Sequence, residues 1–221
     1  MKKYTGICLL LIGGFLAGNR GWAVDAVQAS SAMALQSSPQ PQDFMQQVTN
    51  ELLLKIVEER PHYKKDPQVL YHIVDENITP YVDFPMVARR VMGQFYRQAS
   101  DAQRQRFVGV FKNSLVRTYG NGLSAYDHQT INILPGRGPQ KGKTATVQME
   151  IVSSSGESIP VTYELQRNAA GAWMLENVVL NGINLGLTFR NQFTSDMEQY
   201  RNNIDSVIDH WVPEAPKVHQ P

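Results

Sequence analysis

Two segments decide the fold of this chain: residues 144–151, TATVQMEI, and residues 159–166, IPVTYELQ. In each segment every second residue is a strand-forming apolar residue or alanine, and the positions between them are polar or proline. Side chains of a β-strand alternate between two faces, so this period of two predicts two strands with one buried face. A turn over 153–156 separates the segments and predicts that the strands are antiparallel.

Two further segments show the same pattern. Ile131 and Ile133 alternate with polar residues before the pair, and residues 173–180 follow it after a turn at 168–171. Four strands joined by short turns, with one apolar and one polar face, predict an antiparallel sheet.

Helical patterns fill the first half of the chain. Asp43 is predicted to cap a helix that has apolar residues at four-residue steps, and Asp66 before Pro67 predicts the start of a second helix. A third helix is predicted over 84–96.

The clearest helix follows the capping box Ser100-x-x-Gln103, with large apolar residues at four-residue steps over 107–119. A last helix is predicted after 181–182, where an aromatic stripe runs over 189–211. Helices before and after an antiparallel meander define an α+β fold class.

The N-terminus has the pattern of a secretory signal peptide. Lys2 and Lys3 precede an apolar run over 7–17, and residues 21–23 offer small side chains at the two positions that a signal peptidase recognises. The run is too short for a comfortable membrane span. We expect cleavage after residue 23 and a location outside the cytoplasm; an uncleaved N-terminal anchor is the alternative.

Charge and cysteine content agree with export. Removal of the predicted signal peptide, residues 1–23, takes three of the 21 basic side chains and the lone cysteine, and leaves 18 basic against 20 acidic side chains. This balance argues against a nucleic-acid partner, and a cysteine-free chain suits an oxidising compartment. We expect a disordered linker over 24–42, one folded domain over 43–212 and a flexible tail over 213–221.

A search for catalytic and metal sites finds no complete motif. The loop 136–144 resembles a phosphate-binding loop, but Arg137 stands where the first glycine belongs and the loop leads into a strand. No histidines have the spacing of zinc ligands, and Asp127-His128 lacks a third group that sequence can identify. We expect neither a catalytic nor a metal site.

The densest basic group consists of Arg89, Arg90, Arg97, Arg104 and Arg106. A solvated helix face is the simpler interpretation of such a group. Contact with acidic head groups or with an acidic partner is the more specific one.

Several short segments occur in a fixed order along the predicted folded domain. They are TPYVDF (79–84), VMGQFYRQAS (91–100), QR (103–104) with Phe107 and Phe111, Leu115 with TYG (118–120), IPVTY (159–163), Trp173 before NGINL (181–185), and RNQF (190–193). In this order and spacing the segments resemble the MlaC family, also called the toluene-tolerance family. The chain departs from that family at Asn184, where serine usually follows the glycine.

The resemblance implies a curved antiparallel sheet of four or more strands, with helices before and after it that enclose an apolar cavity for acyl chains. It implies no cofactor, but bound phospholipid as cargo. The positions that would line the cavity are Val91, Met92, Phe107, Phe111, Leu115, Tyr119, Val147, Met149, Val161, Tyr163, Trp173, Ile183, Leu185 and Phe189.

The resemblance also implies a periplasmic carrier and not an enzyme. It would move phospholipid between an outer-membrane lipoprotein–porin complex and an inner-membrane ATP-driven transporter, and would dock on each transiently. Two alternatives stay open from the residues alone. One is an exported chaperone or assembly factor, and the other is an enzyme on a cone-shaped sheet with Asp127-His128 or a buried carboxylate as base.

Overall fold

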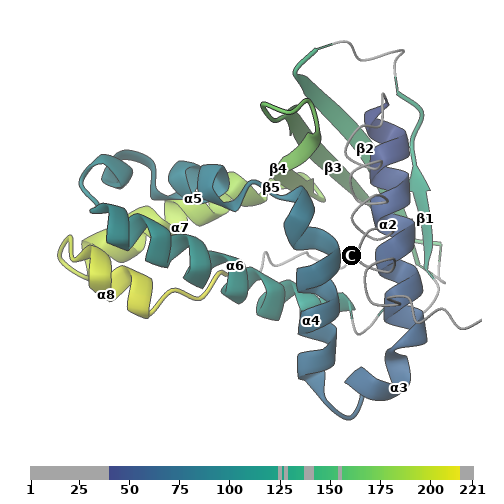
Figure 1. The fold of residues 1–221 in the computed structure, drawn as a ribbon, viewed down its shortest axis with the longest axis horizontal. Coiled ribbons are helices and arrows are strands. Elements are labelled where there is room, and N and C mark those ends of the chain that lie inside the picture. Colours follow the sequence, from purple (N-terminus) through teal and green to yellow (C-terminus); the bar gives the residue numbers. More distant parts are fainter. Residues whose placement is uncertain (1–39, 124–125, 127–128, 137–141, 154–155, 215–221) are drawn as a thin grey trace, which may run out of the picture. The chain divides into compact units, whose positions relative to one another are not determined.

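The computed structural model describes residues 40–123, 126, 129–136, 142–153 and 156–214 (Figure 1). The predicted signal peptide, Asp127-His128 and most of the predicted linker and tail lie outside these residues. Within these ranges, no helix combines the length and the apolar character that a membrane span requires.

Helices begin and end the described chain, and the strands lie between them. The helices before the sheet are α2 (Pro41–Glu58), α3 (Arg60–Tyr63), α4 (Pro67–Ile78), η1 (Thr79–Tyr81), α5 (Phe84–Met92), η2 (Gly93–Arg97) and α6 (Asp101–Leu123). The strands are β1 (Thr130–Ile133), β2 (Thr144–Val152), β3 (Ser158–Arg167), β4 (Trp173–Leu180) and β5 (Ile183–Asn184). Helices α7 (Leu185–Gln199) and α8 (Ile204–Asp209) follow the sheet.

Side-chain caps fix the starts of two predicted helices. The Asp66 carboxylate accepts a hydrogen bond from the Gln68 backbone N–H at 2.9 Å, as expected for the N-cap of α4. At α6, the Gln103 N–H donates to Ser100 Oγ at 3.2 Å, and the Ser100 N–H donates to Gln103 Oε1 at 2.9 Å. The predicted capping box is therefore confirmed.

The boundaries of three other helices differ from the prediction. The last predicted helix is interrupted after Gln199, where Arg201 and Asn202 have φ angles of 52° and 61°, and therefore forms α7 and α8. Asp43 does not cap α2, because the helix already begins at Pro41 with Gln40 at the N-cap. Proline suits this first position, where its missing N–H removes no helical hydrogen bond. The helix predicted over 84–96 ends at Met92, because Gly93 has a φ of 55° and turns the chain into η2.

The five strands form one antiparallel sheet in the order β1-β2-β3-β4-β5, which confirms the α+β class and the sheet of four or more strands. Strand β5 follows a two-residue turn in which Asn181 and Gly182 have φ angles of 48° and 80°. Two successive positive φ angles are what a type I′ hairpin turn requires. Asn184 then caps α7 by accepting a hydrogen bond from the Leu187 N–H at 2.9 Å, a role that serine also fills.

The sheet has an apolar face and a polar face, as the alternation predicts. Tyr163 lies between Val147 and Val178 on the apolar face, whereas the next residue, Glu164, lies opposite Asn177 on the polar face. Helices lie on both sides of this curved, open sheet (Figure 1). Helix α2 contacts β1 and β2, and α5 and α7 contact β4.

Three clusters of buried side chains form the core. The helical cluster consists of Phe84, Ala88, Val91, Met92, Phe95, Ala99, Phe107, Phe111, Phe189, Phe193, Met197, Ile204, Val207, Ile208 and Trp211. The sheet cluster joins α2 to the apolar face and consists of Phe44, Met45, Val48, Tyr81, Ala145, Val147, Leu165 and Trp173. The α2–α4 cluster consists of Leu52, Ile56, Tyr63, Leu70, Ile73 and Val74.

Candidate functional site

The structure places most of the predicted cavity residues in two clusters. Those in the helical cluster are the buried Val91, Met92, Phe107, Phe111 and Phe189, with Leu115, Tyr119 and Leu185 packed against them. Their aromatic rings contact one another: the ring centroids of Phe111 and Phe189 are 5.7 Å apart in an edge-to-face arrangement. These side chains pack as a core between α5, α6 and α7.

The other predicted cavity residues lie on the sheet. Val147 and Trp173 are buried in the sheet cluster, and Tyr163 packs against it. Met149 and Val161 are also buried but belong to none of the three clusters of described residues, and Ile183 is partly exposed. That any of these positions contacts a lipid stays a prediction.

The apolar face continues beyond the part that α2 covers. Ile131 lies opposite Ile151, and Ile151 lies opposite Ile159, so the three form one row across β1, β2 and β3. All three are partly exposed, whereas Val147 on the same face is fully buried. We call these three isoleucines the open row. They are absent from the predicted cavity lining, although the alternation of the sequence places them on the apolar face.

The hydroxyl groups of Tyr119 and Tyr163 lie in apolar surroundings. Burial raises the pKa of Tyr119 and of Tyr163 to about 12, because the ionised form would lose its hydration. The Tyr119 hydroxyl is buried and has no hydrogen-bond partner among the described residues.

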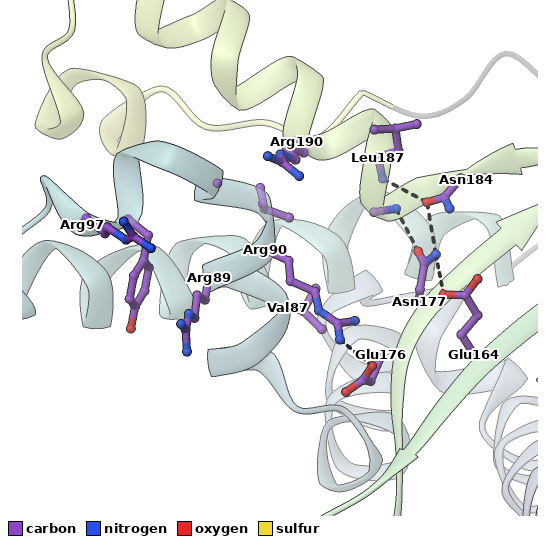
Figure 2. A pocket seen from close by; sticks show the side chains of 14 residues that line it. Val87, Arg89, Arg90, Arg97, Glu164, Glu176, Asn177, Asn184, Leu187 and Arg190 are labelled. Atoms are coloured by element: carbon purple, nitrogen blue, oxygen red, sulfur yellow. Dashed lines mark hydrogen bonds and ion pairs between the residues drawn. The ribbon is translucent and has the colours of Figure 1, made fainter. Parts of the chain in front are cut away.

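A polar pocket lies on the other side of the sheet (Figure 2). It has a volume of about 620 Å³, and it is bounded by α5, η2, the first two turns of α7 and the polar face of β3–β5. Its lining residues are Val87, Arg89, Arg90, Val91, Gly93, Tyr96, Arg97, Glu164, Glu176, Asn177, Asn184, Gly186, Leu187 and Arg190. We call it the arginine pocket.

The basic group predicted from the sequence separates into two parts in the structure. Arg89, Arg90 and Arg97 line the arginine pocket, where Arg190 of α7 joins them. Arg104 instead pairs with Asp101 at 2.9 Å and lies over the Tyr96 ring, 4.4 Å from its centroid.

Arg106 also lies outside the pocket. It pairs with Asp205 at 2.7 Å and with Asp209, both on α8. Only part of the predicted basic group is therefore available to an external anion, and Arg190 could not be grouped with it from sequence.

Hydrogen bonds among amide side chains fix the polar wall of the pocket. Asn177 Nδ2 donates to Glu164 Oε2 and to Asn184 Oδ1, both at 3.1 Å, while Asn177 Oδ1 accepts from the Gly186 N–H at 3.0 Å. Figure 2 shows this network between β3, β4 and the start of α7. Each amide group therefore links two or more elements of the wall.

The described residues offer no group of three or more histidine, cysteine, aspartate or glutamate side chains that could hold a metal ion. The candidate dyad Asp127-His128 is outside those residues.

These features define an α+β domain whose antiparallel sheet has an open apolar face on one side and a cationic pocket on the other. The sequence profile of the MlaC protein family matches residues 46–212. The chain belongs to the MlaC family.

Two relatives agree with this assignment. The toluene tolerance protein ttg2D of Pseudomonas putida is 37% identical over 181 residues, which is 81% of this chain and 83% of that protein. The intermembrane phospholipid transport system binding protein MlaC of Haemophilus influenzae is 26% identical over 147 residues, 66% of this chain and 69% of that protein.

A solved structure has the same fold. It is the phospholipid-binding protein from Ralstonia solanacearum in complex with a phospholipid. The TM-score is 0.69 at 24% identity, and the match covers 76% of this chain and 92% of that protein.

Proposed function

We propose that this protein is a periplasmic phospholipid carrier. Membership of the MlaC family supports the proposal, as do the name of the Haemophilus influenzae relative and the phospholipid bound by the Ralstonia solanacearum protein. In this role the chain would exchange lipid with an outer-membrane lipoprotein–porin complex and an inner-membrane ATP-driven transporter. It would act without catalysis and without a cofactor.

The open row is the observation that carries the proposal. Ile131, Ile151 and Ile159 extend the apolar face beyond the part that α2 covers, and they stay partly exposed. An apolar surface of this kind is stabilised when an acyl chain covers it. The predicted cavity residues Met149 and Val161 lie next to this row on the same face, and Tyr163 follows them on β3.

The energy of burial determines how such a carrier must work. Burying one methylene group is worth about 0.8 kcal/mol, so a 16-carbon chain gains on the order of 12 kcal/mol. Release into water would therefore be negligibly slow. Exchange has to occur where a docked partner offers another apolar site, because only the difference between the two burials then matters.

The first test is extraction of the purified protein with organic solvent, followed by mass spectrometry. We expect close to one phospholipid per protein. An extract without lipid would contradict the proposal. Binding of unfolded peptides by such lipid-free protein would favour a chaperone.

A pair of substitutions locates the lipid. Ile151→Glu places a charge in the open row, where an acyl chain would leave it unpaired, so we expect most of the lipid to be lost. Thr146→Glu adds the same charge on the exposed polar face of the same strand and should leave the lipid content unchanged. Circular dichroism checks that both variants are folded. Full lipid content in a folded Ile151→Glu protein would remove the open row from the site.

A further inference from the structure

We propose that the arginine pocket is a second binding site, which takes the phosphate ester of a phospholipid head group. The proposal goes beyond the carrier function, because this site is separate from the surface that would hold the cargo. Its ligand would belong to another phospholipid, such as one at a membrane surface.

The sheet separates the two sites. Glu164 and Asn177 lie opposite each other on the polar face and both line the arginine pocket. Tyr163 and Val178, each adjacent to one of them in sequence, lie on the apolar face. A phosphate bound among the arginines is therefore on the opposite side of β3 and β4 from an acyl chain on the open row.

The pocket has an excess of positive charge, since four arginines face two glutamates. Arg90 pairs with Glu176 at 2.8 Å, and Glu164 accepts a hydrogen bond from Asn177. Within the described part of the chain, the guanidinium groups of Arg97 and Arg190 form no ion pair and no hydrogen bond. Their guanidinium groups are thus available to an anion from outside, unlike those of Arg104 and Arg106, which aspartates already neutralise.

The backbone and an aromatic ring position two of these arginines. Arg190 Nε lies 3.0 Å from the place that a Cβ atom on Gly93 would occupy, so the glycine makes room for the side chain. The guanidinium carbon of Arg89 lies 5.5 Å from the centroid of the Tyr96 ring. A planar guanidinium held in this way presents parallel N–H groups, which match the oxygens of a phosphate.

Size and apolar surface favour a lipid head group over free phosphate. A volume of about 620 Å³ exceeds what one inorganic phosphate needs, and Val87 and Leu187 add apolar surface to the lining. Leu187 is 54% exposed. A glycerophosphoryl group would use the arginines for its phosphate and this apolar surface for its carbon atoms.

Isothermal titration calorimetry of the full protein tests the proposal with two soluble probes, glycerophosphoglycerol and inorganic phosphate. The variant is the double substitution Arg97→Gln and Arg190→Gln. The matched control is Arg117→Gln, which removes an exposed charge on α6 outside the pocket. We expect the double variant to weaken glycerophosphoglycerol binding by roughly tenfold or more, the control to have no effect, and salt to weaken binding.

Each result has a defined meaning. Tighter binding of glycerophosphoglycerol than of phosphate supports the head-group site, whereas equal or tighter binding of phosphate overturns the assignment to a head group. Absence of saturable binding, equal weakening in the control, or binding of an acidic peptide in place of both probes would overturn the proposal. The phospholipid that copurifies with the double variant is measured in parallel: unchanged cargo supports a second site, whereas lost cargo overturns it and leaves the carrier function intact.

Discussion

Gly93 has a backbone conformation that residues with a side chain rarely adopt, with φ 55° and ψ −124°. It ends α5 and begins η2, and its missing side chain leaves space for Arg190 of α7. One residue thereby serves both the local turn and the packing of a distant helix.

Gly93→Ala should therefore reduce the free energy of unfolding by about 1–3 kcal/mol, because alanine is strained at this φ and crowds Arg190. Urea denaturation measures the change. Gly109→Ala is the control: Gly109 lies inside α6 with nothing within 4 Å of the added carbon, so it should gain about 0.5–1 kcal/mol. If both substitutions stabilise the protein, the strain assigned to Gly93 is absent.

The sequence predicts the role of a residue best when its hydrogen-bond partner lies close to it along the chain. Asp66 and the Ser100–Gln103 box make hydrogen bonds within three residues, and the structure confirms both. The left-handed turn at Gly93 also depends on a single residue, but nothing in the helical spacing over 84–96 distinguishes this glycine from one inside a helix.

Helix α6 begins with a reciprocal pair of capping hydrogen bonds. Ser100 and Gln103 satisfy each other's backbone N–H groups, which would otherwise lack partners at the first turn. Helix α6 also contributes Phe107 and Phe111 to the helical cluster, so loosening its first turn affects the packing of α7 and α8.

Ser100→Ala should cost about 1 kcal/mol of unfolding free energy, since the N-cap oxygen is lost. Thermal or urea denaturation provides the measurement. Ser195→Ala changes an exposed serine within α7 and should remain within about 0.5 kcal/mol of the wild type. Equal effects of the two substitutions would argue against a special role for the cap.

The sequence predicts the strands and the apolar face of the sheet, but not which part of that face α2 covers. A period of two identifies the apolar face of β2 and β3 because it depends only on strand geometry. How much of that face α2 covers depends on the tertiary position of a helix about 90 residues earlier. For this reason the sequence does not distinguish the buried Val147 from the partly exposed Ile151.

At the scale of the whole molecule, the structure brings together groups that are far apart in sequence. Arg190 lies about a hundred residues after Arg89–Arg97, and the two segments meet because α5 and α7 pack against β4. No local pattern indicates such a pocket. Family resemblance and alternation therefore predicted the fold and the class of function, but not this second site.

If the protein is a carrier that exchanges lipid only on docking, its cargo should stay bound in buffer. We expect protein loaded with a fluorescent phospholipid to retain it over hours of dilution, and to lose it when phospholipid vesicles or a membrane partner are added, because water offers no apolar site in exchange. The emission of the bound probe follows the release. Rapid loss into buffer without any acceptor would contradict this mechanism.

Strand β3 separates the apolar face of the sheet from the arginine pocket, with Tyr163 on the apolar face and Glu164 on the polar face. Because successive side chains point to opposite faces, inserting or deleting one residue in this strand, without a bulge to absorb the change, would exchange the two faces. A carboxylate would then point toward the acyl-chain surface and an aromatic ring toward the arginines. A substitution at one position of β3 keeps this alternation, whereas a change of length keeps it only where a bulge absorbs the extra residue, as β4 does at Glu176 opposite the Glu164–Leu165 step.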